Sequence, residues 1–143
     1  MSSQPPYGGH TGKTKTLGLD YSVAGLLAYL PICCINVICS IIWLVSEPKE
    51  NKVLRFHSLQ SLLLCGVGIV CWIILWILGF VLAAGAGAAD SGGMALGGGL
   101  LILLLEIVLG GIILIVDIIA LIKAYQGQIW KIPVIGEIAD KNT

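Results

Sequence analysis

Three long apolar stretches divide the sequence, and polar or charged residues bound each of them. They run from Ser22 to Ser46, from Ser58 to about Ala84 and from about Leu100 to Ala124. An α-helix rises about 1.5 Å per residue, so about 20 apolar residues cross a hydrocarbon core that is about 30 Å thick. The pattern therefore predicts an all-α fold, an integral membrane bundle of three transmembrane helices.

The segments outside these spans are polar or of mixed character. Residues 1–20 are rich in Gly, Ser, Thr and Pro and have no apolar run, which predicts a disordered N-terminal tail. Residues 21–126 form the predicted membrane domain, in which a charged loop at 47–57 and a flexible glycine-rich connection at 85–99 separate the spans. Residues 127–143 are too short to span and predict a C-terminal interfacial segment.

Composition supports a membrane protein and excludes nucleic acid as a partner. Hydrophobic residues make up 57% of the chain and charged residues 11%, whereas soluble proteins average about 25% charged residues. The formal net charge is +0, so the chain offers no broad basic surface. The lipid bilayer is the expected partner, together with a second copy of the chain or other membrane proteins that pack on a stripe of small residues. That stripe consists of Ser58, Ser61, Cys65 and Gly68.

The basic residues predict an orientation for three spans. Two of them precede the first span, and the other six lie either in the first loop or from the end of the third span onward. Cytoplasmic segments carry an excess of Lys and Arg. We therefore expect the C-terminus in the cytoplasm and the N-terminus outside, in the plasma (cell inner) membrane. The six are Lys49, Lys52, Arg55, Lys123, Lys131 and Lys141.

Two acids interrupt the third apolar stretch. An ionised carboxylate that faces lipid costs at least about 2.5 kcal/mol, so Glu106 and Asp117 need protein, water or a proton. Eleven residues make about three helical turns, which places both acids on one face. Asp117 lies about two turns from the cytoplasmic end of its span, where Arg55 or His57 is expected to pair with it. Ordinary snorkelling of Arg55 to headgroups is the alternative.

Polar residues at the ends of the spans complete a candidate functional polar cluster. It comprises Arg55, His57, Gln60, Asp117, Glu106 and Asn36. No nucleophile has a base and an orienting acid beside it in sequence, and the five cysteines lack the spacing of structural zinc sites. We therefore expect no catalytic residues, no cofactor and no metal site, and the chain is not expected to be an enzyme.

Two sequence stretches carry a resemblance to a known family. ENKVLRFHSLQSLLL covers residues 50–64, and IKAYQGQIWKIPVIGEIADK covers residues 122–141. Together they resemble a small, uncharacterised family of prokaryotic-type membrane proteins related to the twenty-kilodalton Tic component of the chloroplast protein importer. The positions that carry the resemblance are Asn51, Lys52, Arg55, Phe56, His57, Gln60, Ala124, Gly127, Trp130, Pro133, Ile135 and Gly136.

The resemblance implies a multi-pass membrane protein without established catalytic residues. The importer components have four spans and are proposed to move preproteins, whereas this chain lacks a strong fourth span. We therefore expect a structural or accessory membrane subunit. The alternative is a membrane transport or protein-translocation component that uses the intramembrane acids, and an intramembrane enzyme is the remote alternative.

Overall fold

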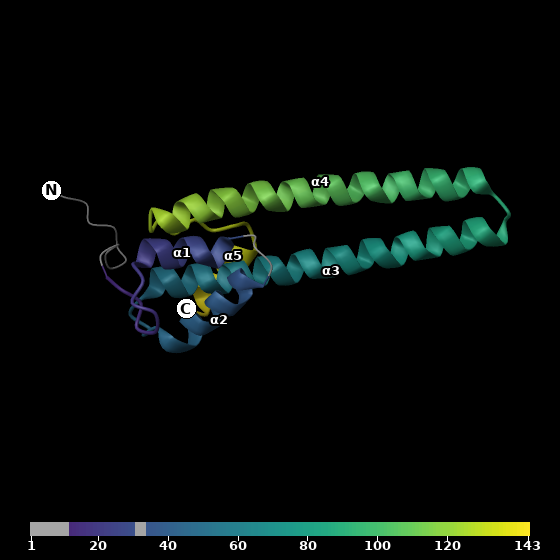
Figure 1. Cartoon of the computed structure of the whole chain (residues 1–143). Coiled ribbons are helices and arrows are strands. Elements are labelled where there is room, and N and C mark those ends of the chain that lie inside the picture. Colours follow the sequence, from purple (N-terminus) through teal and green to yellow (C-terminus); the bar gives the residue numbers. More distant parts are fainter. Residues whose placement is uncertain (1–11, 31–33) are drawn as a thin grey trace. The chain divides into compact units, whose positions relative to one another are not determined.

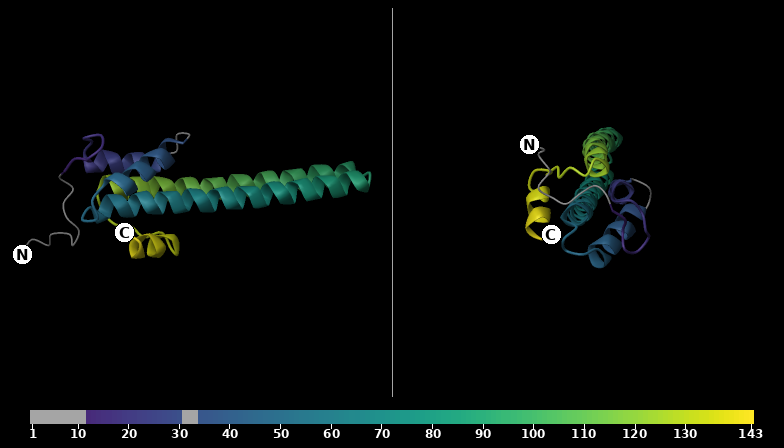
Figure 2. Two further views of the ribbon diagram at one scale, coloured as in Figure 1. Left: turned by 90° about the horizontal axis from the view of Figure 1, so that it is seen from below. Right: turned by 90° about the vertical axis from the view of Figure 1, so that its left-hand side faces the viewer.

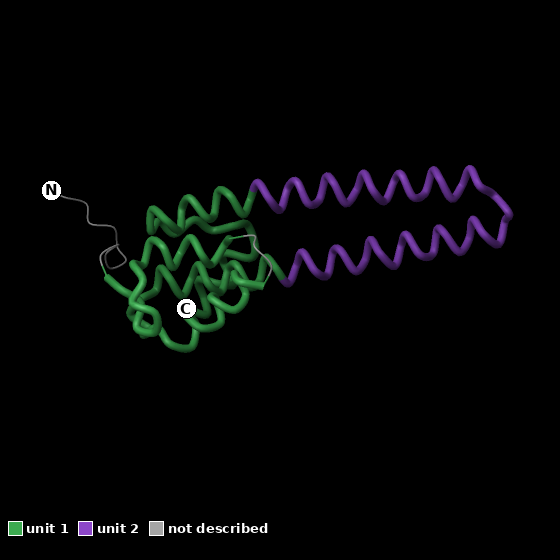
Figure 3. The backbone as a smooth tube through the Cα atoms, in the orientation of Figure 1, with its two compact units in different colours: residues 1–65, 116–143 green, residues 66–115 purple. Residues whose placement is uncertain are grey.

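The computed structural model describes residues 12–30 and 34–143, which contain five helices (Figure 1). The described residues group into two compact units, with residues 12–30, 34–65 and 116–143 in unit 1 and residues 66–115 in unit 2 (Figure 3). The two longest helices contribute to both units. The predicted all-α class is confirmed for the described residues. The helices are α1 Tyr21–Tyr29, α2 Ile35–Ser46, α3 Lys52–Ala88, α4 Gly92–Tyr125 and α5 Ile135–Lys141.

The prediction of three membrane-spanning helices is wrong. Among the described residues two helices, α3 and α4, are long and apolar enough to cross a bilayer. The predicted first span, 22–46, is divided between α1 with 9 residues and α2 with 12. Leu30 takes an extended conformation (φ −67°, ψ 115°) directly before Pro31, and α1 ends there because a residue that precedes proline is disfavoured in the helical region.

The two ends of the predicted first span lie together. The backbone N–H of Lys15, ahead of α1, donates a hydrogen bond to Oε1 of Glu47, directly after α2, at 2.8 Å. A straight helix across the hydrocarbon core would separate its ends by about 30 Å. The apolar run therefore folds back on itself as a pair of contacting helices.

Small side chains allow the helices of unit 1 to pack closely. A Cβ atom built on Gly25 of α1 would lie 3.0 Å from the carbonyl oxygen of Ala124 on α4, so only glycine fits without adjustment. Alanines on α1 and α4 meet around two buried aromatic rings, which produces a core despite the short helices. The buried core consists of Ala24, Ala28, Tyr29, Trp43, Leu54, Ala120 and Ala124.

The segment that precedes α1 differs in part from the predicted disordered tail. Residues 1–11 of that tail lie outside the described residues. Lys13 pairs with Asp20 in an isolated antiparallel bridge, and Thr14 donates its N–H to the Leu19 carbonyl at 2.8 Å. Gly18 turns this segment with a positive φ of 63°, which glycine adopts without strain. The residues just before α1 therefore form a hydrogen-bonded turn, and the disorder of the tail stays a prediction.

Unit 2 is an antiparallel hairpin made from the distal part of α3 and the proximal part of α4 (Figure 2). A Cβ atom added to either of two glycines of α3 would contact a side chain of α4: at Gly68 it would lie 3.6 Å from Ile113, and at Gly79 it would lie 3.6 Å from Ile102. The residue number rises on one helix as it falls on the other, which is the signature of an antiparallel pair.

The predicted glycine-rich connection is mostly helical. α3 continues to Ala88 and α4 begins at Gly92, so the link is reduced to residues 89–91, where Asp90 has a positive φ of 46°. A glycine costs a helix about 1 kcal/mol relative to alanine. In lipid an unbonded backbone group costs several kcal/mol, so helix is favoured even through a glycine-rich segment.

Candidate functional site

Gln60 is the centre of a buried polar cluster in unit 1. Its side chain is fully buried on α3 and links α1 to the segment between α4 and α5. Nε2 donates to Tyr29 Oη at 3.0 Å and to the carbonyl oxygen of Trp130 at 3.2 Å. Oε1 accepts the backbone N–H of Ile132 at 3.2 Å. One amide therefore satisfies three groups from two different parts of the chain.

The hydrogen bonds around His57 have a fixed direction. Nε2 lies 3.1 Å from the carbonyl oxygen of Gln128, which can only accept, so Nε2 carries the proton. Nδ1 then accepts a hydrogen bond from the Tyr29 hydroxyl at 3.3 Å. That hydroxyl in turn accepts from Gln60. Both nitrogens of the buried, neutral imidazole are satisfied, and the ring adds edge contacts to Phe56 and Tyr29.

Arg55 binds the C-terminal end of α2. Its Nη1 donates to the carbonyl oxygen of Leu44 at 2.6 Å and to that of Glu47 at 3.0 Å. The last carbonyls of a helix have no partner within the helix, and a cation near them also interacts favourably with the helix dipole. Arg55 therefore acts as a C-terminal cap that fixes α2 against the start of α3.

Glu47 joins three segments at the same end of unit 1. It is 3% exposed, and its Oε2 accepts a hydrogen bond from Asn51 Nδ2 at 3.1 Å while Oε1 binds the Lys15 backbone. Burial raises the pKa of the Tyr21 phenol at the start of α1, and the negative charge of the neighbouring Glu47 carboxylate raises it further. The charged loop before α3 is therefore an organised part of unit 1.

The predicted ion pair of Asp117 is wrong. Arg55 binds backbone carbonyls, His57 binds Tyr29 and Gln128, and Asp117 makes no hydrogen bond or ion pair within residues 12–30 and 34–143. Asp117 is half-buried in unit 1, and its carboxylate interacts electrostatically with the Tyr29 hydroxyl. It therefore lies at the border of the polar cluster.

The two remaining predicted residues do not join that cluster. Asn36 accepts the backbone N–H of Val37 through Oδ1 at 2.8 Å, a local bond near the start of α2. Glu106 belongs to unit 2 and is half-exposed on the face of α4 that carries Ile102 and Ile113. The structure thus unites Gln60 and His57 through Tyr29, places Asp117 at their border, directs Arg55 to the end of α2, and leaves the other two apart.

The two stretches that carry the family resemblance contact one another. Gly136 of α5 lies so close to the cluster that an added Cβ would come 2.8 Å from Gln60 Oε1 and 2.6 Å from Lys131 Cα. A positive φ of 68° at Val134 turns the chain into α5 just before it. The motif glycine is therefore required by close approach, and the motif glutamine by the backbone that it binds.

Sequence reasoning missed Tyr29 and Glu47. Tyr29 lies inside an uncharged run and reads as an ordinary interfacial aromatic residue, and Glu47 reads as a solvated loop acid. Ser61, from the predicted small-residue stripe, donates to the carbonyl oxygen of Ala28, while Ser58 donates to that of Leu54 at 2.8 Å. Part of that stripe is thus already occupied by contacts within unit 1.

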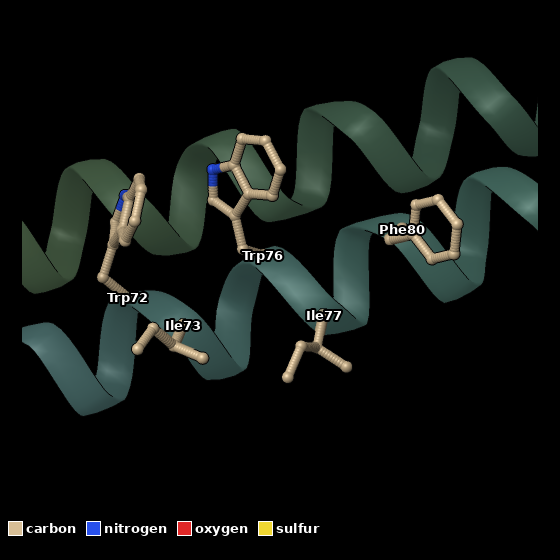
Figure 4. Close-up of a pocket in the computed structure, with 5 residues that line it drawn as sticks. All are labelled: Trp72, Ile73, Trp76, Ile77 and Phe80. Carbon is tan, nitrogen blue, oxygen red and sulfur yellow. The ribbon is translucent and has the colours of Figure 1, made fainter.

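A separate apolar groove of about 410 Å³ lies on unit 2 (Figure 4). Two tryptophan rings in it lie 5.8 Å apart at an angle of 45°. Within residues 12–30 and 34–143, no group of three or more His, Cys, Asp or Glu side chains is arranged to hold a metal ion. The groove is lined by Trp72, Ile73, Trp76, Ile77 and Phe80.

The chain belongs to the magnetosome magnetite crystal formation protein family, which matches residues 17–139. It is also similar to UPF0132 membrane proteins of archaea. One from Methanocaldococcus jannaschii is 36% identical over 130 residues, which cover 91% of this chain and 94% of the relative. A second from that organism is 30% identical over 129 residues, covering 90% and 74% of the two chains.

A third relative, from Archaeoglobus fulgidus, is 30% identical over 121 residues, covering 84% of this chain and 92% of the relative. No solved structure matches the chain. Membership of a small membrane-protein family is therefore confirmed, and the relatives' names together with the apolar helices support a membrane location. None of these matches links the chain to the Tic component, so that part of the resemblance stays a prediction.

Proposed function

We propose that this family member is a structural or accessory membrane subunit without catalytic activity, anchored by unit 2 and presenting unit 1 as a folded platform. The observation that carries the proposal is the internal use of the motif side chains. Gln60, His57 and Arg55 all bind backbone groups of their own chain. Side chains committed in this way stabilise a fold and have little capacity left for a substrate.

The proposal includes an orientation with both ends of the chain in the cytoplasm, at the plasma (cell inner) membrane. All eight Lys and Arg residues lie outside residues 66–115, either up to Arg55 or from Lys123 onward. An antiparallel hairpin that crosses twice leaves its flanking segments on one side, and the positive-inside rule favours the cytoplasm for them. From Lys52 to Ala88, α3 rises by about 54 Å, which is more than a hydrocarbon core of about 30 Å requires.

Self-association or association with other membrane proteins belongs to this proposal. The outer faces of unit 2 are apolar and rich in glycines that meet no neighbour, among them Gly97, Gly99 and Gly111. Helices in membranes associate where small residues let their backbones approach. The family description names magnetite crystal formation, and a membrane subunit that assists other proteins is compatible with such a process.

The rival function is a transport or protein-translocation component. One observation favours it: Glu106 and Asp117 make no hydrogen bond or ion pair within the described residues, and unpaired acids at membrane depth often mark a conduction path. An assembly of several copies could place these acids along a shared polar route. The link to the Tic component would belong to this rival.

Flux through reconstituted vesicles separates the two proposals. The full chain is inserted into liposomes that hold a pH-sensitive dye, and proton and ion fluxes are compared with those of empty liposomes. The accessory proposal predicts equal fluxes. A flux that disappears in Glu106→Gln or Asp117→Asn, but persists in the exposed control Glu137→Gln, would establish the rival.

Chemical cross-linking in native membranes tests the positive content of the proposal. An accessory subunit is expected to give defined cross-linked species with a second copy or with a recurring membrane partner. Cross-linked products that are spread without preference over abundant membrane proteins would contradict an accessory role, because a subunit has specific neighbours.

A further inference from the structure

The helix pair α1–α2 has the length of half a membrane. With 9 and 12 residues, the two helices rise by about 13 Å and about 18 Å, against about 15 Å for one leaflet of the hydrocarbon core. The run from Ser22 to Ser46 that they occupy contains no charged residue. It is therefore as apolar as a span but too short, once folded back, to reach the other side.

The exposed face of α2 needs an apolar environment. Its inner face contributes Ser40 and Trp43 to the interior of unit 1, where both are fully buried. Its outer face carries large apolar side chains at spacings of three and four residues, which form one stripe along the helix. These are Ile35 (40% exposed), Ile38 (55%), Ile41 (49%) and Val45 (83%).

The charged end of unit 1 lies where α1 begins and α2 ends. The end of α2 is held at Arg55 through the Leu44 carbonyl, and the last turn of α1 is held at Ser61, further along α3, through the Ala28 carbonyl. Since Glu47 joins the start of α1 to the end of α2, the pair runs alongside α3 from Arg55 towards Ser61. Charged residues therefore mark the start of the pair, and apolar residues mark its far end.

We infer that α1 and α2 form a re-entrant hairpin that enters one leaflet and returns to the same side, with the α2 stripe against lipid acyl chains. The inference rests on the two-span orientation of the proposed function. Within the leaflet, the interior of each helix satisfies its own backbone groups, the Ala28 carbonyl near the end of α1 accepts a hydrogen bond from Ser61 of α3, and Gly25 of α1 packs against α4. The occupant of the α2 stripe is the bilayer in which unit 2 is anchored.

Side-specific labelling tests where the run begins and ends. In a variant whose five cysteines are replaced by alanine, single cysteines are introduced as Asp20→Cys, Glu50→Cys and Ser91→Cys, and sealed vesicles are treated with a membrane-impermeant maleimide. Asp20→Cys and Glu50→Cys are expected to react from the same side. Reaction from opposite sides would mean that the run spans the bilayer, and would overturn the inference.

Ser91→Cys reports on the proposed orientation separately. It lies at the turn between α3 and α4 and is expected to react from the opposite side to Glu50→Cys. If it reacts from the same side, the two-span anchor fails. If it reacts from the opposite side while Asp20→Cys reacts from the other side than Glu50→Cys, the two-span anchor of α3 and α4 stands, and the re-entrant hairpin fails together with the cytoplasmic placement of the N-terminus.

Depth measurements test the lipid contact of α2. Nitroxide labels at Val45, Ile41, Ile38 and Ile35 in the cysteine-free chain are compared for collisions with oxygen, which enriches in lipid, and with a water-soluble nickel chelate. The ratio of oxygen to nickel collisions is expected to rise steadily from Val45 to Ile35. The exposed Leu17, labelled in the same way, should remain accessible to nickel and serves as the aqueous control.

The other depth profiles would each overturn the inference. Nickel access at all four positions would place the stripe in water. A profile that rises and falls again along α2 would indicate a crossing. Protection from both reagents would mean that a second copy or another protein covers the stripe.

Discussion

Unit 1 and unit 2 share two helices but differ in where their polar side chains lie and in what these side chains bind. Unit 1 contains every Lys and Arg of the chain, and its buried polar side chains bind backbone groups far apart in sequence. Unit 2 covers residues 66–115, all of which the structure describes. Within these described residues it contains a single side-chain hydrogen bond, in which the Ser91 hydroxyl accepts the backbone N–H of Met94. Large apolar residues there are widely exposed, among them Phe80 (73%) and Leu96 (72%).

This difference shows how one helix can serve two environments. Where α3 passes through unit 1, its polar side chains replace water with fixed partners, and removal of a partner leaves a buried group unsatisfied. Where α3 passes through unit 2, lipid can cover the side chains and the backbone satisfies itself. Replacement of a polar side chain by an apolar one should therefore be harmful in unit 1 and neutral or favourable in unit 2.

Gln60→Ala should have the largest effect. It removes three hydrogen bonds and leaves Tyr29, the Trp130 carbonyl and the Ile132 N–H without their partner in a buried site. Each unsatisfied buried group costs about 1–3 kcal/mol, so we expect a loss of about 4 kcal/mol in the free energy of unfolding. Thermal unfolding in detergent, followed by circular dichroism, measures the change.

Gln126→Ala is the matched control for Gln60→Ala. Gln126 is the same residue type but is exposed just beyond the end of α4. Its replacement should alter the free energy of unfolding by less than about 0.5 kcal/mol. Equal stability of the two variants would show that the buried cluster contributes nothing to folding and would remove the distinction between the units.

Arg55→Ala should rank next, because it removes the cap of α2. The carbonyls of Leu44 and Glu47 lose a charged donor, which is expected to lower stability by about 2 kcal/mol. Lys52→Ala is the control, because Lys52 is an exposed cation at the start of α3, the helix that carries Arg55. Its replacement should change the free energy of unfolding little. If both variants lose stability equally, general charge is responsible and the cap is not.

The sequence predicts the class of the fold and the position of the long helices, because apolar runs bounded by charges leave few alternatives. It does not predict that the run 22–46 folds back. A proline in an apolar run is compatible with a kinked span as well as with a break, and the hydrogen bond between Lys15 and Glu47 that decides between them joins residues 32 positions apart.

The candidate site was predictable in its members and not in its connections. Residues such as Gln60 and His57 stand out as polar groups at a helix entrance, but their partners are mostly backbone atoms, which have no signature in the sequence. The expectation that Asp117 binds Arg55 failed because helix depth alone says nothing of which carbonyls lie nearby. The end of α2 offered Arg55 a closer set of acceptors.

Two glycine substitutions, one in each unit, test the difference in packing between the units. Gly136→Ala in unit 1 would place a Cβ against Lys131 and Gln60 and should cost about 1.5 kcal/mol. Gly97→Ala in unit 2 enters open space within α4 and should be neutral, or stabilising by up to about 1 kcal/mol. Thermal unfolding of both variants measures the contrast, and opposite signs are the expected result.

Glu106→Leu should have the smallest effect, with a sign opposite to that of Gln60→Ala. Glu106 shares the α4 face of Ile102 and Ile113, which meets α3, and it has no hydrogen-bond or ion-pair partner within the described residues. Leucine at this position would remove the cost of holding an acid in lipid and would add apolar contact with α3, so stability should rise by about 1 kcal/mol. Glu106→Gln, which removes the acid but keeps a polar group of the same size, should give a smaller gain than Glu106→Leu. A loss as large as that of Gln60→Ala would mean that Glu106 has a partner on another chain, and the two units would then depend on polar contacts alike.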